Sequence, residues 1–242
     1  MIEETYAAFA AWEFSRSKRE NLTRLREENY IGASSATWLR DVAKVLNRRA
    51  DPQGADRPLV MLAKQGCSLD VWKPLLLWHI TRDEFLLRDF LVNWLYPAYE
   101  EGVYRVRPEN LYTYLRDIVG RGGTTEHAWT ETTIKRVATG LLKMAVDFGL
   151  LRGSVVKEFS SYHLPEPSML YLLHAISDEQ GSPRKVIDAP DWRMFFMSPS
   201  DVEAELLRLH QFRKLQYDVA GSLVQLTLPS QSLHEFSEKM LV

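Results

Sequence analysis

Two threonines and three cations recur at helical spacing in the middle of the chain, so a helix there would project all five side chains from one face. Lysine and arginine can engage phosphates or guanine edges, and threonine offers a hydroxyl and a methyl group. No acidic residue stands among the five. The pattern is typical of a helix that contacts nucleic acid, and its members are Thr132, Lys135, Arg136, Thr139 and Lys143.

The opposite side of the same segment is apolar, which predicts one helix from about Thr130 to Phe148 with a core face. Gly140 lies in the middle of this helix, where glycine costs about 1 kcal/mol relative to alanine. We therefore expect another element to pack closely against Gly140. The predicted core positions are Ile134, Val137, Ala138, Leu141, Leu142, Ala145 and Val146.

Short elements surround this helix. In chain order we expect a strand at Val103–Val106, a helix from Pro108 to about Val119, a turn at Gly120–Gly123, the long helix, a glycine stop at Gly149 and a short hairpin. The hairpin would carry Arg152 and Lys157 on its flanks. This order predicts a winged helix-turn-helix. Two alternatives stay open, because winged helices also bind proteins and an exposed basic face is often merely solvated.

A second group of cations occupies residues 16–49, which hold nine Lys and Arg against four Asp and Glu. They fall on two expected helices, the second of which begins at Ser34 or Ser35. Because cations near a helix C-terminus also complement its dipole, a solvated face and a phosphate-contacting face are equally supported. The candidate contacts are Arg16, Lys18, Arg19, Arg24, Arg26, Arg40, Lys44, Arg48 and Arg49.

The formal net charge of −2 hides this uneven distribution. Residues 103–157 hold nine cations against five acids, whereas residues 158–242 hold seven against twelve. Local fields steer a polyanion to a protein face more than the total charge does. The basic blocks are thus compatible with nucleic acid, and the acidic C-terminal third favours a protein partner.

The chain reads as a mainly α protein in three parts. Residues 1–102 are expected to form a basic helical N-terminal domain, residues 103–160 the winged helix-turn-helix, and residues 161–242 a small α+β unit that resembles a winged helix. Within the first part, Thr81–Glu84 fits a capping box and predicts a new helix start. In the last part, Ser198 would cap a helix that precedes a two-stranded hairpin.

No catalytic, cofactor-binding or metal-binding signature appears. The sequence has no zinc-protease, phosphate-loop, nucleophile-elbow or dinucleotide motif, so we expect neither an enzyme nor a cofactor. His79 and Asp83 stand one turn apart, but further ligands are missing and a structural pair is the simpler interpretation. The single cysteine, Cys67, is expected to be a buried apolar side chain in a cytoplasmic protein.

A membrane partner is not expected. The most apolar stretches, Trp72–Ile80 and Phe85–Tyr99, are interrupted by polar residues and fall short of the roughly 20 apolar residues that span a bilayer. The N-terminus lacks the positive start of a signal peptide.

Short motifs spread over most of the chain carry a family resemblance. They are Tyr6 with Phe9, Arg88–Leu91, Trp129–Lys135, Phe148–Leu151, Asp191–Phe195 and Ala220–Ser222. On these residues the chain resembles the BrxA-like family of bacteriophage exclusion (BREX) defence systems. The resemblance implies a mostly helical fold, likened to the antiterminator NusB, and a DNA-binding accessory without catalysis of its own.

The expected partners are therefore double-stranded DNA, bound largely through phosphates, and other subunits of a phage-defence complex. The rival interpretation is a scaffold in which the same helix face docks an acidic protein and no DNA is bound.

Overall fold

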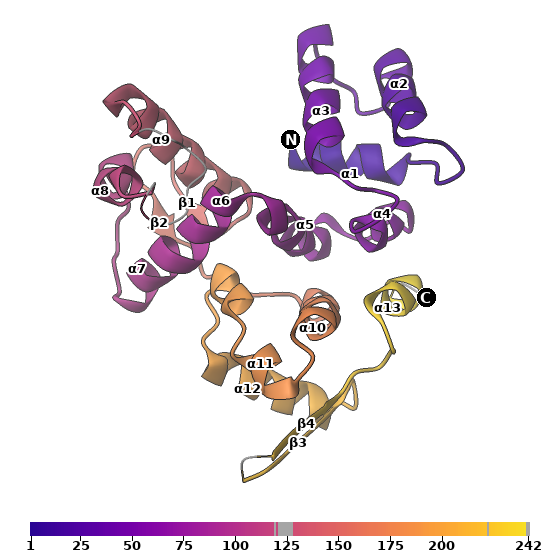
Figure 1. The fold of residues 1–242 in the computed structure, drawn as a ribbon, viewed down its shortest axis with the longest axis vertical. Coiled ribbons are helices and arrows are strands. Elements are labelled where there is room, and N and C mark those ends of the chain that lie inside the picture. Colours follow the sequence, from indigo (N-terminus) through magenta and orange to yellow (C-terminus); the bar gives the residue numbers. More distant parts are fainter. Residues whose placement is uncertain (119, 121–127, 222, 241–242) are drawn as a thin grey trace. The chain divides into compact units, whose positions relative to one another are not determined.

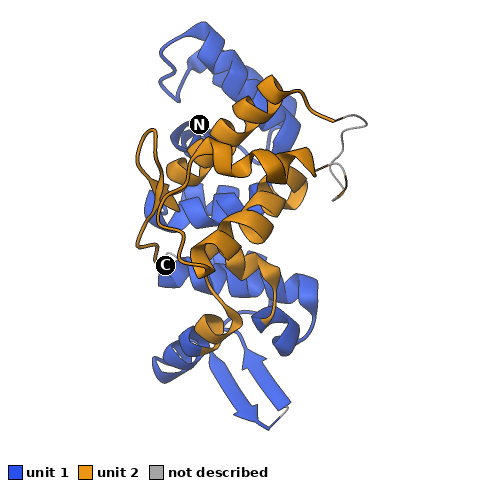
Figure 2. Ribbon diagram, turned by 90° about the vertical axis from the view of Figure 1, so that its left-hand side faces the viewer, with its two compact units in different colours: residues 1–80, 165–187, 204–242 blue, residues 81–164, 188–203 orange. Residues whose placement is uncertain are grey.

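The computed structural model describes residues 1–118, 120, 128–221 and 223–240, most of which are helical (Figure 1). The mainly α prediction is confirmed. Internal contacts group the chain into two compact units (Figure 2). The first unit comprises residues 1–80, 165–187 and 204–242, and the second comprises residues 81–164 and 188–203. This grouping does not follow the three expected ranges, whose independence as folding domains stays a prediction.

The first unit begins with four helices, and two of them have side-chain caps at their starts. Ser17 and Glu20 form a reciprocal capping box, and the Ser35 side chain accepts a hydrogen bond from the amide of Trp38, which confirms the expected start. Asn29, in the left-handed conformation, ends the second helix. The four helices are α1 (Ile2–Ala10), α2 (Lys18–Glu28), α3 (Ala36–Arg49) and α4 (Arg57–Lys64).

Three further helices and a hairpin from distant parts of the sequence complete this unit. The helix α13 packs against α4 and α10, and α11 packs against β4. The hairpin strands pair antiparallel from Gln216 opposite Thr227 to Ala220 opposite Leu223, as expected from the sequence. The elements are α10 (Glu166–Gln180), α11 (Pro183–Ile187), β3 (Gln216–Ala220), β4 (Leu223–Thr227) and α13 (Leu233–Lys239).

Two helices run from one unit into the other. The helix α5 (Leu69–Asp83) begins in the first unit and ends in the second, and α12 (Pro199–Gln211) runs the opposite way. The capping-box prediction was wrong at this point: α5 continues through Thr81, which is buried, and the next helix begins only at Phe85. Tertiary burial of the threonine overrides its local capping preference.

The second unit combines one long helix and several short ones with two very short strands. Its elements are α6 (Phe85–Phe90), the π-helical turn η1 (Leu91–Leu95), α7 (Tyr96–Glu100), the 3-10 turn η2 (Pro108–Leu111), α8 (Tyr112–Arg116), α9 (Glu131–Asp147), β1 (Leu151–Arg152), β2 (Glu158–Phe159) and the 3-10 turn η4 (Pro190–Phe195). The expected helix after Pro108 is thus a 3-10 turn followed by one short helix. Of the expected Gly120–Gly123 turn, only Gly120 lies among the described residues.

Polar contacts join the parts of the second unit that are far apart in sequence. Arg88 donates two hydrogen bonds to the Asp191 carboxylate, at 3.0 and 2.9 Å. The buried Asp89 carboxylate accepts from the hydroxyl of Tyr114 at 2.5 Å and from the Asn93 amide at 2.7 Å. Because a buried carboxylate is costly without such donors, these bonds fix α8 against the α6–η1 segment.

Candidate nucleic-acid interface

The helix α9 has the two faces that the sequence predicts. The Thr130 side chain caps its start by accepting from the amide of Thr133, and Gly149, at φ +80°, follows its end. On the core face, five of the seven predicted residues are buried, and Val137 and Val146 are half-buried. The buried five are Ile134, Ala138, Leu141, Leu142 and Ala145.

All five predicted contact residues of α9 are exposed, although their side chains are not equally available. The Lys143 ammonium pairs with Asp147 at 3.0 Å, and the Thr139 hydroxyl donates to the carbonyl of Lys135 at 2.9 Å. Lys135 and Arg136 form no ion pair with any described residue. Together with Thr132, they are the side chains of this face that the described fold leaves open to a ligand.

The one acidic residue in the first turn of α9 is neutralised within the unit. Glu131 accepts two hydrogen bonds from Arg116 of α8, both at 3.0 Å. These bonds hold the pKa of the Glu131 carboxyl below its usual value, so it stays ionised and paired. The pair also joins α8 to the start of α9.

The expectation for Gly140 was wrong. A Cβ placed on Gly140 would have no described atom within 4 Å apart from its own helix, and the residue is exposed. No described element therefore requires a glycine there. Because Gly140 has no side chain, the backbone is exposed there, on the same side of α9 as Arg136.

The two-stranded sheet after α9 corresponds to the expected hairpin, or wing. Leu151 pairs with Phe159 and Arg152 with Glu158, and an isolated bridge pairs Val106 with Lys157. Of the two predicted wing contacts, Arg152 is exposed. Lys157 is half-buried, and its ammonium donates to the carbonyl of Ser154 inside the loop between the strands.

Two further arginines lie beside this wing and were missed from the sequence. Arg105 and Arg107 flank the buried Val106, and both are exposed. The sequence does offer a signal for them, because arginine alternates with Val106 at the end of the expected Val103–Val106 strand. They lie near Arg152 because the Val106–Lys157 bridge joins these two segments, which are far apart in sequence.

The N-terminal candidate cations divide into engaged and open side chains. Arg24 pairs with Glu13 and with Glu28, and its guanidinium lies over the ring of Tyr30. These contacts join α2 to the segment between α1 and α2, so they give Arg24 a structural role. Arg16 pairs with Glu13, Lys18 donates to the carbonyl of Ala50, and Arg40 donates to that of Ala36.

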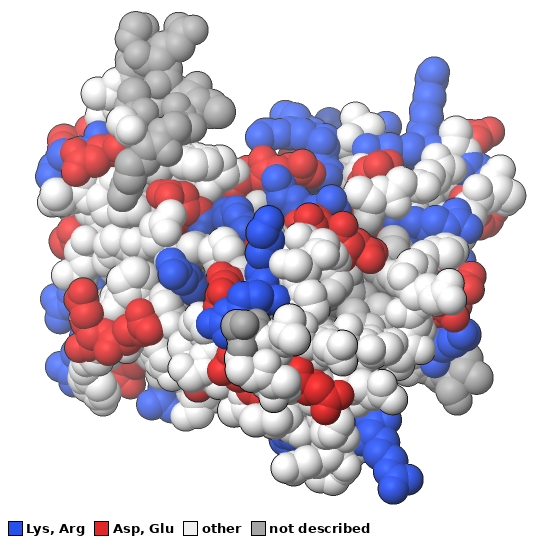
Figure 3. Space-filling view, turned by 60° about the horizontal axis from the view of Figure 1, so that its bottom comes forward, with Lys and Arg blue, Asp and Glu red and all other residues white. Residues whose placement is uncertain are grey.

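Three of the remaining N-terminal candidates are more available. Arg19, Arg26 and Lys44 are exposed and form no ion pair with a described residue. Arg48 and Arg49 are exposed at the end of α3. On the face drawn in Figure 3, acidic side chains are interspersed with basic ones, so the positive charge on that face is divided into small groups.

A comparison with family models gives a match to the BrxA model over residues 1–175. The chain belongs to the BrxA family. Membership identifies it as a component of a BREX phage-defence system, as the resemblance implied. Searches of curated proteins and of solved structures found no match to the chain.

The BrxA match includes every candidate cation on α2, α3, α9 and the wing. It ends within α10, so the β3–β4 hairpin and α13 lie beyond the matched range. The basic helices and the wing therefore lie inside the matched range.

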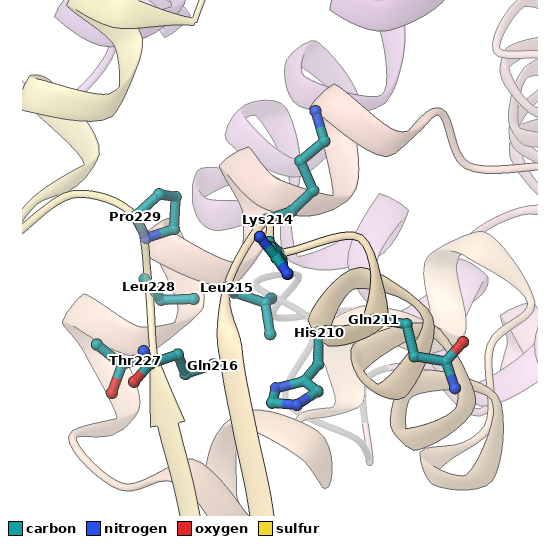
Figure 4. Close-up of a pocket in the computed structure, with 9 residues that line it drawn as sticks. His210, Gln211, Lys214, Leu215, Gln216, Thr227, Leu228 and Pro229 are labelled. Atoms are coloured by element: carbon teal, nitrogen blue, oxygen red, sulfur yellow. The ribbon is translucent and has the colours of Figure 1, made fainter.

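A cavity of about 710 Å³ lies beyond the matched range, at the end of α12 (Figure 4). The backbone amide of Tyr217 donates to Nδ1 of His210 at 3.1 Å, which gives this ring a structural role. Arg213 and Lys214 follow the last turn of α12, where cations complement the helix dipole. The lining contains no carboxylate or cysteine: His210, Gln211, Arg213, Lys214, Leu215, Gln216, Thr227, Leu228 and Pro229.

Two other candidate groups in this BrxA-family chain, His79 and Cys67, are buried. His79 pairs with Asp56 and Tyr171 instead of Asp83. Burial raises the pKa of the Cys67 thiol to about 11, so it stays protonated. Across the described ranges, no three His, Cys, Asp or Glu residues gather as metal ligands would. Nor is any helix in those ranges long and apolar enough to cross a membrane.

Proposed function

We propose that this BrxA-family protein is a non-catalytic accessory subunit that binds duplex DNA, mainly through its phosphates. The observation that carries the proposal is α9: one face is buried against its own unit, while the other presents Lys135 and Arg136 without ion-pair partners in the described structure. Guanidinium and ammonium groups on an exposed helix face are suited to phosphate oxygens and guanine edges.

The order of elements supports a winged helix-turn-helix for this part of the chain. A strand residue at Val106 precedes α8 and α9, and the β1–β2 hairpin follows them. The α6–η1–α7 segment would supply the first helix, because Asp89 bonds Tyr114 of α8 and Trp94 packs near the same ring. In such a motif α9 is the helix that enters the major groove.

The decisive experiment is a salt titration of duplex DNA binding by fluorescence anisotropy. We expect the wild type to bind with a log–log salt slope of several units, because each neutralised phosphate releases counterions. The Lys135→Glu/Arg136→Glu variant should bind at least about tenfold more weakly, a loss of about 1.4 kcal/mol. Circular dichroism should show that the variant is still folded.

Arg19→Glu/Lys44→Glu is the matched control, since it reverses two exposed, unpaired cations elsewhere and changes the net charge equally. Unchanged binding in the control supports the α9 interface. If the control loses binding and the α9 variant retains it, the DNA-binding surface lies on α2 and α3 instead. No binding by the wild type at low salt would overturn the proposal.

A scaffold function is the second candidate, favoured by the β3–β4 hairpin. Val219 and Val224 are directly opposed on its apolar face, which continues from the buried Tyr217 to the exposed Val219. On the other face Leu223 is 70% exposed. Unpartnered apolar side chains of this kind suit a protein interface.

This second function has a separate test. When the protein is produced together with the other defence subunits, Val219→Ser/Leu223→Ser should reduce co-purification and leave DNA binding unchanged. Co-purification equal to that of the wild type would show that the hairpin docks none of those subunits.

A further inference from the structure

We propose that the outer face of the wing is a second phosphate-binding surface whose strength is limited by one glutamate. The surface consists of Arg105, Arg107 and Arg152, and the limiting residue is Glu158. This inference rests on the proposed DNA-binding function and adds to it a contact surface and a residue that tunes it.

Strand geometry gathers the three arginines on one face. Val106 and Lys157 exchange two backbone hydrogen bonds of 2.8 Å, and the Val106 side chain is fully buried on the inner side. Because successive side chains of a strand point to opposite sides, Arg105 and Arg107 project outward from the sheet. Arg152 lies opposite Glu158 in the ladder, so these two share a face.

Ion-pair distances confirm that Arg105 belongs to the same face. A Glu158 carboxylate oxygen lies 3.9 Å from Nε of Arg105, and the other lies 3.5 Å from a terminal nitrogen of Arg152. One carboxylate thus bridges two guanidinium groups that come from parts of the chain far apart in sequence.

The charges on this face are unbalanced. Three arginines share this face with the Glu158 carboxylate, which reaches only Arg105 and Arg152, and the Arg107 side chain forms no ion pair with any residue in the described ranges. The side chains of Arg105 and Arg152 are 64% and 70% exposed, compared with 28% for Glu158. The arginines therefore reach further into solvent than the acid that holds them.

A phosphate group can replace the glutamate as their partner. Exposed ion pairs contribute little to stability, so the arginines can leave Glu158 at small cost. Guanidinium groups bind phosphate oxygens through two parallel hydrogen bonds, which a phosphodiester offers as readily as a carboxylate does. The Arg105 guanidinium also lies 5.4 Å from the ring centre of Tyr104, which helps to hold it in place.

Glu158 has a predictable effect on affinity. In the free protein it neutralises part of the positive field, and in the complex its charge lies near the phosphates. Removing that charge should therefore strengthen DNA binding, and we expect Glu158→Gln to bind duplex DNA about threefold to tenfold more tightly. It should also steepen the salt dependence, since the arginines would then neutralise more phosphate charge.

Glu109→Gln is the matched control for that substitution. Glu109 is exposed on η2 in the same unit, forms no ion pair with a described residue, and carries the same charge. If Glu158→Gln tightens binding and Glu109→Gln changes it less than twofold, the bridging carboxylate is responsible. Equal effects of both variants would overturn the role of Glu158.

A loss-of-function variant tests the arginines themselves. Replacing Arg105, Arg107 and Arg152 together with glutamine should lower the salt slope by about three, roughly one for each lost phosphate contact. A wild-type slope in this variant would overturn the second surface.

The outcomes separate this inference from the function on which it rests. If the wild type binds no DNA, the proposed function fails. If Lys135→Glu/Arg136→Glu loses DNA binding while Glu158→Gln matches Glu109→Gln and the triple arginine variant keeps the wild-type salt slope, only the inference fails. If Glu158→Gln tightens binding of poly-glutamate but not of duplex DNA, the face binds an acidic protein and the inference is also overturned.

Discussion

His79 illustrates how a buried polar residue is held by partners far away in sequence. Its Nδ1 lies 2.7 Å from an Asp56 carboxylate oxygen, and its Nε2 lies 2.8 Å from the Tyr171 hydroxyl. The imidazole thereby joins the start of α4, α5 and α10 within the first unit. Both ring nitrogens are used inside the protein, so His79 is a structural residue.

Removing the Tyr171 hydroxyl tests how much this hydrogen-bond network contributes to the stability of the protein. In Tyr171→Phe one nitrogen of the buried His79 ring loses its partner, and we expect the free energy of unfolding to fall by about 1 to 3 kcal/mol. Urea denaturation followed by circular dichroism measures the change. Tyr112→Phe is the control and should change it by less than about 0.5 kcal/mol. Equal losses in both variants would contradict the assigned role of the bond.

At the scale of elements, α9 could be predicted almost completely because its signals are local. The Thr130 cap, the Gly149 stop and the apolar spacing all lie within the helix or beside it. The wing arginines could not be placed together, because the bridge between Val106 and Lys157 depends on the packed unit. For the same reason the sequence linked His79 to the nearby Asp83, whereas its partners are Asp56 and Tyr171.

Two glycines of the second unit should respond in opposite ways to alanine. Gly153, between β1 and β2, has φ +103°, and a Cβ there would clash with the carbonyl oxygen of Val156. Gly153→Ala should therefore lower stability by about 1 to 3 kcal/mol. Gly140→Ala, in open space on a helix, should raise stability by about 1 kcal/mol. Chemical denaturation of both variants checks this, and a destabilised Gly140→Ala would reveal packing at that position.

At the scale of the whole molecule, each unit is assembled from separate stretches of chain. The second unit needs residues 188–203, which supply Asp191 for Arg88 and Phe196 for Tyr99. The rings of Tyr99 and Phe196 stack with centres 4.5 Å apart, and Arg193 lies over Tyr96. A contiguous fragment around the wing therefore lacks part of its own core.

A fragment of residues 81–164 should accordingly fail to fold cooperatively. Without residues 188–203 it loses the bidentate partner of Arg88 and the Phe196 ring, which packs against both Tyr99 and Phe159. Thermal unfolding followed by circular dichroism should give a broad transition, compared with a sharper one for the full chain. A sharp transition together with full DNA affinity would show that residues 188–203 are dispensable.

The paths of α5 and α12 limit how recombination can vary the gene for this protein. Each of these helices is continuous across the boundary between the units, and the chain passes that boundary at residues 80/81, 164/165, 187/188 and 203/204. A single recombination breakpoint cannot exchange one unit without cutting the other. Changes in the proposed DNA contacts would then arise by point substitution at exposed positions such as Arg136 and Arg105, while both cores are inherited together.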